Sequence, residues 1–222
     1  MTSQGITLVY MGDSVTVGQH IDPALRWTSL VDQRLRTEFG EAVGAQNSGV
    51  SGETTRMGLE RFPHAVQEFR PDVMTLQFGL NDCNCWRTDE GLPRVSPAAF
   101  VANLNEMIER ARLFGAAEIV LATNHRTLRR GPLPSGEPYE EANARYNELI
   151  RDVAAASGVT LCDVWQAFVP FDDRILERML LPAPDALHLS EEGNRVYCDA
   201  IWPFVRESVS TVLTSKGALI ER

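Results

Sequence analysis

Short apolar runs alternate with longer amphipathic stretches along almost the whole chain, and this alternation constrains the fold most strongly. The apolar runs are rich in Val, Ile and Leu and are short enough to be strands that are buried on both faces. The expected strands are Ile6–Met11, Ala42–Gln46, Val73–Phe78, Glu118–Thr123 and Val159–Cys162. The expected helices are Trp27–Phe39, Thr54–Phe69, Pro97–Phe114, Tyr139–Ala156 and Glu191–Val212.

This alternation predicts an α/β fold, because strands that alternate with helices form a parallel sheet with right-handed crossovers. We expect a three-layer α/β/α sandwich with a central, mainly parallel five-stranded sheet. A chain of 222 residues is long enough to bury a substantial core, so we expect one domain over residues 1–222, with its core at about 5–212. Ligands of such sheets bind beyond the carboxyl ends of the strands, where functional residues are therefore expected.

Composition argues against several classes of protein. The net charge of −9 and the single lysine, Lys216, are unsuited to a nucleic-acid groove, which requires clustered cations. The longest apolar stretches fall well short of the roughly 20 residues of a membrane span. The first apolar run follows neither a basic region nor a cleavage site, so we expect a cytoplasmic protein, with a removed leader as the alternative.

The four cysteines, Cys83, Cys85, Cys162 and Cys198, form no CxxC pair, and a chain of this length needs no disulfides to hold its core. We expect them to be reduced. Cys83 and Cys85 are spaced as two zinc ligands would be, but no second well-spaced His/Cys pair accompanies them. The sequence predicts neither a metal site nor a cofactor.

Four polar motifs follow expected strands or precede the last expected helix. They are Gly12-Asp13-Ser14, the run NSGVSGET at 47–54, Gly79-Leu80-Asn81-Asp82 and Asp185-Ala186-Leu187-His188. Taken singly, the first is typical of a helix cap and the second of a turn. Neither the G-x-S-x-G elbow of α/β-hydrolases nor the G-x-G-x-x-G of dinucleotide-binding proteins is present.

Together these motifs predict nucleophilic catalysis. The hydroxyl of Ser14 becomes a good nucleophile when a neutral imidazole takes its proton, and the imidazole needs an acceptor on its other nitrogen. His188 and Asp185, three residues apart, can supply both. The backbone N–H groups of Ser14 and Gly52 and the side-chain amide of Asn81 are the expected donors to the oxyanion.

In this order, the four motifs resemble the sequence blocks of the SGNH/GDSL hydrolase superfamily, and the resemblance extends from residue 5 to about 205. It implies a flavodoxin-like sandwich in which Ser14, Gly52, Asn81 and His188 are the name-giving residues and Asp185 completes the triad. Two features depart from the pattern. Val15 stands where lipolytic members often carry Leu, and the segment 83–86 (CNCW) matches no family feature.

The expected function is that of a serine esterase that acts on a small-molecule ester through an acyl-enzyme. Short acyl groups, acetyl above all, on a sugar or another polar alcohol are favoured, because the long loops 88–97 and 131–138 are rich in Pro, Gly and charge and offer no apolar lid. The alternatives are a lipase or lysophospholipase, an acyltransferase with the same triad, and a non-catalytic binding module. The oligomeric state is not predicted.

Three further residues are candidates for substrate contact: Asp13, His125 and Arg126. His125 and Arg126 belong to the segment 124–130, which carries three arginines in an otherwise acidic chain. A guanidinium binds carboxylate or phosphate through two parallel hydrogen bonds, so one of these arginines is a candidate anion-binding residue. The alternative is a solvated loop that balances nearby carboxylates.

Overall fold

The computed structural model describes residues 5–220, and its centre is a parallel sheet of five strands. The strands are β1 (Ile6–Gly12), β2 (Val43–Gly49), β3 (Val73–Gln77), β4 (Glu118–Ala122) and β5 (Thr160–Cys162). They lie in the order β2-β1-β3-β4-β5, and every neighbouring pair is parallel. The predicted sheet is therefore confirmed.

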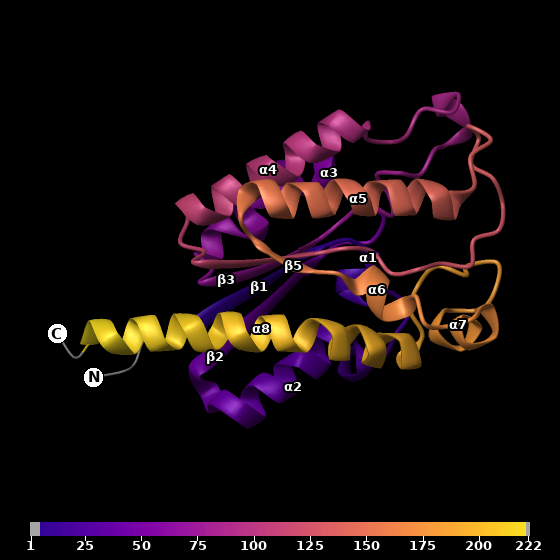
Figure 1. The fold of residues 1–222 in the computed structure, drawn as a ribbon. Coiled ribbons are helices and arrows are strands. Elements are labelled where there is room, and N and C mark those ends of the chain that lie inside the picture. Colours follow the sequence, from indigo (N-terminus) through magenta and orange to yellow (C-terminus); the bar gives the residue numbers. More distant parts are fainter. Residues whose placement is uncertain (1–4, 221–222) are drawn as a thin grey trace.

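Helices cover both faces of this sheet, which gives the expected three layers (Figure 1). The long helices α3, α4 and α5 lie on one face, and α2 and α8 lie on the other. The helices are α1 (Ser14–Val17), α2 (Trp27–Phe39), α3 (Thr55–Ala65), α4 (Pro97–Leu113), α5 (Tyr139–Ser157), α6 (Val164–Phe168), α7 (Asp173–Met179) and α8 (Glu191–Ile220). Short 3-10 turns occur at η1 (Pro23–Leu25), η2 (Gly40–Ala42), η3 (Gln67–Phe69) and η4 (Arg87–Asp89).

Three elements differ clearly from the predicted boundaries, and one of them is α8, which extends beyond Val212 to Ile220. Strand β2 continues to Gly49, because Ser48 and Gly49 still pair with the end of β1. The single helix predicted over 54–69 is divided into α3 and η3, and Pro63, which has no N–H to donate, lies in the last turn of α3. Within residues 5–220, every helix, α8 included, is too short or too polar to span a bilayer.

An aromatic cluster on the α2/α8 face fixes the start of α1. The ring of Trp27 lies 5.3 Å from that of Tyr10 and 4.7 Å from that of Tyr197, and all three are fully buried. Burying a large side chain of this kind stabilises the fold by about 1.5–3 kcal/mol. The indole Nε1 donates to the carbonyl oxygen of Val15 at 2.9 Å. The cluster thus ties β1, α2 and α8 to the helix that begins at Ser14.

The turns after β1 and β2 approach each other closely at the carboxyl edge of the sheet. A Cβ on Gly12 would lie 2.1 Å from Thr16 Oγ1, and a Cβ on Gly49 would lie 2.4 Å from the backbone nitrogen of Val17. Only glycine fits at these two positions, so the sequence Gly12-Asp13-Ser14 brings its serine directly against the turn that follows β2.

Candidate active site

Ser14 is the first residue of α1 and follows β1 directly. Its neighbour Asp13 caps the helix, since Asp13 Oδ1 accepts from the backbone N–H of Val15 at 2.9 Å. Ser14 is only 4% exposed, and it lies in a pocket at the carboxyl edge of the sheet. The strand-to-helix turn therefore presents the Ser14 hydroxyl where ligands of parallel sheets bind.

A hydrogen-bonded chain joins Ser14 to the segment before α8. His188 Nε2 lies 2.9 Å from Ser14 Oγ, and His188 Nδ1 lies 2.7 Å from Asp185 Oδ2. An ionised carboxylate only accepts, so Nδ1 must donate, and Nε2 of the neutral ring is left to accept from the serine hydroxyl. This is the geometry that removes a proton from a serine nucleophile.

The turn from Asp185 to His188 supports this arrangement. Asp185 Oδ1 accepts from the backbone N–H groups of Leu187 at 3.0 Å and His188 at 2.7 Å. Burial by itself would raise the pKa of Asp185, but the hydrogen bonds from the His188 backbone and ring and from Leu187 outweigh it and lower that pKa. Asp185 is therefore ionised at neutral pH and can stabilise a positively charged imidazole.

The expected oxyanion donors line the same pocket as Ser14. Gly52 has a φ of 79°, in the left-handed region that favours glycine, and Asn81 follows β3. Asn81 Nδ2 lies 3.3 Å from Asp13 Oδ2, and Asn81 Oδ1 accepts from Arg94 at 3.3 Å. Because a guanidinium only donates, Arg94 fixes which end of the Asn81 amide is the oxygen.

Arg94 was not expected from the sequence. Besides Asn81, it donates to the carbonyl oxygen of Gly52 at 3.1 Å, so it joins the two loops that carry the candidate oxyanion donors. Its guanidinium lies 4.4 Å from the ring centre of Trp86, which belongs to the segment 83–86 that matched no family feature. A lone arginine in an irregular loop gives no sequence signal of such a role.

None of the three candidates for substrate contact lines the pocket. Asp13 is fully buried, and burial raises its pKa to about 7. His125 is also fully buried, with Nε2 2.8 Å from the carbonyl oxygen of Leu187, and burial lowers its pKa to about 4, so it is a neutral donor to the turn from Asp185 to His188. Arg126 donates to the carbonyl oxygen of Phe171 at 2.8 Å. All three residues thus make contacts within the protein, and their contact with substrate stays a prediction.

The pocket itself is small, about 160 Å³. It is lined by Ser14, Gln19, Gly52, Leu80, Asn81, Asn84, Arg129, Tyr139, Leu187 and His188. A second cavity of about 430 Å³ shares Asn84, Arg129 and Tyr139 with it, so the two spaces adjoin. Arg129 belongs to the arginine-rich segment 124–130. It lies three residues after Arg126, the arginine that was the candidate for substrate contact.

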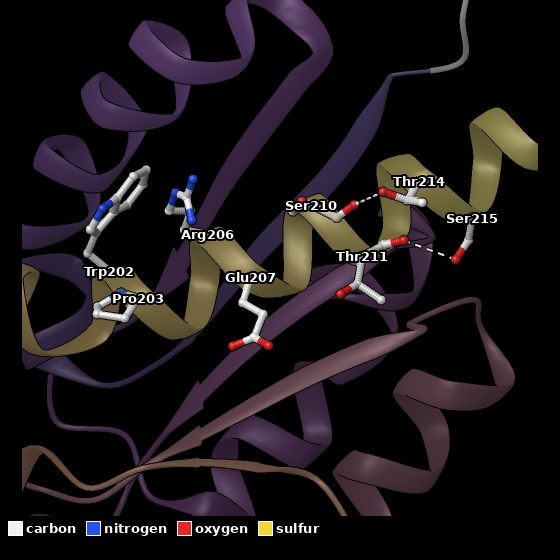
Figure 2. Close-up of a pocket in the computed structure, with 8 residues that line it drawn as sticks. All are labelled: Trp202, Pro203, Arg206, Glu207, Ser210, Thr211, Thr214 and Ser215. Atoms are coloured by element: carbon white, nitrogen blue, oxygen red, sulfur yellow. Dashed lines mark hydrogen bonds between the residues drawn. The ribbon is translucent and has the colours of Figure 1, made fainter.

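A larger groove, of about 830 Å³, lies along α8 and is separate from the site (Figure 2). None of its lining residues belongs to the Ser14 pocket. The hydroxyls of Thr214 and Ser215 donate to backbone carbonyl oxygens of the helix itself. Arg206 is held by Glu38 of α2. The residues that line the groove include no histidine, so no imidazole there can activate a hydroxyl.

The C-x-C pair is embedded in the protein. Cys83 Sγ lies 3.6 Å from the carbonyl oxygen of Leu80, and Cys85 Sγ lies 3.5 Å from that of Gly91. Burial raises the pKa of Cys83 far above its usual range. Among residues 5–220, no three His, Cys, Asp or Glu side chains are grouped closely enough to hold a metal ion.

Known proteins are similar to this chain in sequence and in fold. The profile of the GDSL-like Lipase/Acylhydrolase family matches residues 10–196. The chain is 28% identical to the uncharacterized lipoprotein YqeF of Bacillus subtilis, and the match covers 87% of each chain. It is 32% identical to Esterase TesA of Pseudomonas aeruginosa, and this match covers 52% of this chain and 53% of the esterase. A lipase/acylhydrolase from Enterococcus faecalis has a similar crystal structure, with a TM-score of 0.73 and 26% identity over 93% of this chain and 96% of that one.

Proposed function

Because the chain belongs to the GDSL-like lipase/acylhydrolase family and is a serine hydrolase of ester bonds, we propose that it cleaves short-chain esters, acetyl above all, of a sugar or another polar alcohol, with Ser14 as nucleophile. The observation that carries this proposal is the hydrogen-bonded chain from Asp185 through His188 to Ser14, which ends in a small pocket. The resemblance found in the sequence is confirmed by the family match.

The proposed reaction has two steps. Ser14 Oγ attacks the acyl carbon while its proton passes to His188 Nε2, and Asp185 stabilises the resulting imidazolium. The bond to the alcohol oxygen then breaks, and His188 returns the proton to the departing alcohol. Water attacks the acyl-enzyme in the same way, with His188 as base, and this releases the carboxylic acid and restores Ser14.

During both steps a negative charge develops on the former carbonyl oxygen. We propose that it is bound by the backbone N–H groups of Ser14 and Gly52 and by Asn81 Nδ2, all of which belong to pocket-lining residues. Arg94 is the proposed positioning residue, because its contacts with Asn81 Oδ1 and the Gly52 carbonyl hold both donors in place without reaching the substrate.

Replacement of Asn81 by alanine tests the oxyanion role. We expect kcat to fall about 10²–10³-fold with KM little changed, because a donor of this kind acts mainly in the transition state. Steady-state kinetics on an acetyl ester measure the effect. Asn103→Ala is the control, since this asparagine donates to Thr55 Oγ1, its one side-chain hydrogen bond within residues 5–220, and lies outside the pocket. A raised KM with unchanged kcat would instead make Asn81 a ground-state contact.

The size of the pocket predicts the preferred acyl group. Its volume of about 160 Å³ is below the roughly 300–1,000 Å³ of pockets for drug-sized ligands, so we expect turnover to decrease as the acyl chain lengthens. Nitrophenyl esters from acetyl to octanoyl, measured beside O-acetylated sugars, give the profile, and Ser14→Ala gives the background. Faster cleavage of octanoyl than of acetyl esters would favour a lipase or lysophospholipase.

A further inference from the structure

The walls of the Ser14 pocket and the adjoining cavity are free of acidic side chains, although the chain carries a net charge of −9. Two arginines line these spaces instead. Arg129 lines both of them, and Arg130 lines the adjoining cavity. A guanidinium in a wall without acidic side chains attracts anions, because no carboxylate of the wall itself cancels its field. Arg129 is therefore the side chain of most interest beside the proposed nucleophile.

Arg129 differs from its two neighbours in the arginine-rich segment. Arg130 forms an ion pair with Asp173, and Arg126 faces the same carboxylate at 3.8 Å. In the part of the chain that the structure describes, no carboxylate oxygen lies within 4 Å of Arg129. The charges of Arg126 and Arg130 are thus compensated within the protein, whereas that of Arg129 is available to a ligand.

The guanidinium of Arg129 is held in place through its Nε and its face, and no acceptor among residues 5–220 takes a hydrogen bond from its terminal nitrogens. Nε donates to the carbonyl oxygen of Asp185 at 3.3 Å, and the guanidinium carbon lies 5.3 Å from the ring centre of Tyr139. Tyr139 is itself fixed, because its hydroxyl donates to the carbonyl oxygen of Leu80 at 2.6 Å. Such a fixed guanidinium can bind a carboxylate or phosphate with two parallel hydrogen bonds and loses little side-chain freedom on binding.

We propose that Arg129 binds an anionic oxygen group, carboxylate or phosphate, on the alcohol part of the substrate. The proposal rests on the proposed esterase function. Both parts of an ester extend from the carbon that Ser14 attacks, and the space of about 160 Å³ around Ser14 suits the short acyl group. The alcohol part then enters the cavity of about 430 Å³, which Arg129 joins to the Ser14 pocket. The enzyme selects acylated, negatively charged alcohols.

The test uses two substrates with the same scissile bond. These are the acetate ester of para-hydroxyphenylpropionate and the acetate ester of the corresponding amide, which differ in one charge far from the ester. The readout is the ratio of kcat/KM for the anionic ester to that for the neutral one. Taking a ratio removes any general effect of a substitution on the Asp185–His188 turn. The variants are Arg129→Gln, Arg129→Lys and, as the control from the same loop, Arg126→Gln.

We expect Arg129→Gln to lower this ratio at least about 10-fold, because the ion pair between the partly buried guanidinium and the substrate carboxylate is lost. Arg129→Lys should give an intermediate ratio, and Arg126→Gln should leave the ratio within about 2-fold, as expected for a charge already paired in the protein. The proposal is overturned by a wild-type ratio at or below one, or by equal changes in Arg129→Gln and Arg126→Gln.

Binding of para-hydroxyphenylpropionate itself, followed by saturation-transfer NMR, gives a readout that does not depend on turnover. We expect signal transfer to the anion with the wild-type protein, and little transfer with Arg129→Gln or with the amide. Cleavage of neither ester would refute the proposed function, and this binding measurement would still decide on the role of Arg129. Equal transfer to anion and amide would refute the anion site while leaving the esterase function intact.

Discussion

Replacing Ser14 by alanine is expected to lower kcat on an acetyl ester by at least about 10⁴-fold, because no covalent acyl-enzyme can form without the serine oxygen. The Ser14 hydroxyl contacts His188 and lies in the pocket, so its loss removes the proposed nucleophile without disturbing the core. Stopped assays with enough enzyme to detect slow turnover measure the decrease.

The matched control for this substitution is Ser210→Ala, which removes the hydroxyl of an exposed serine on α8. We expect its kcat to equal that of the wild type. Circular dichroism and the thermal midpoint establish that both variants are folded. A decrease of less than about 10-fold in a folded Ser14→Ala variant would exclude Ser14 as the nucleophile.

The second large effect is expected for His188→Ala, with a decrease in kcat of similar size. The hydrogen-bonded chain has one imidazole between Ser14 Oγ and Asp185 Oδ2, and without it the serine proton has no acceptor. His64→Ala is the control, because the His64 side chain is exposed and its ring pairs with Glu68 of the neighbouring turn η3. The two variants are compared by kcat/KM on one ester.

A double variant, Ser14→Ala with His188→Ala, adds a check on this pair. Groups that act as one unit are not additive, so the double variant should be about as slow as either single variant. If the decrease in kcat of the double variant instead equals the product of the two single decreases, His188 acts independently of Ser14, as a purely structural residue would.

The sheet could be predicted from the sequence because buried parallel strands are almost continuously apolar, as in β1 and β4. The helices α1, α6 and α7 were not predicted. They have 4, 5 and 7 residues, which is too few to show a helical period. The long helices were predicted to within a few residues, except that α8 extends beyond Val212 to Ile220.

The candidate site was only partly predictable, for a different reason. Asp185 and His188 are three residues apart in one turn, so their contact follows from local spacing. His125 and Arg126 follow the end of β4, but the sequence does not say which way each side chain points. The structure directs His125 toward the carbonyl oxygen of Leu187 and Arg126 toward Phe171, and it brings Arg129 into the pocket. Orientation of this kind depends on packing between distant segments.

Labelling with a serine-directed phosphonate tests the central claim most directly, because the attacking oxygen forms a bond to phosphorus as the leaving group departs. Mass spectrometry of the digested protein identifies the modified residue, and residual activity is measured in the same samples. We expect one adduct, on Ser14, that appears in proportion to the loss of activity and is absent from His188→Ala. An adduct on any other residue, or inactivation without a modified Ser14, would contradict the assignment.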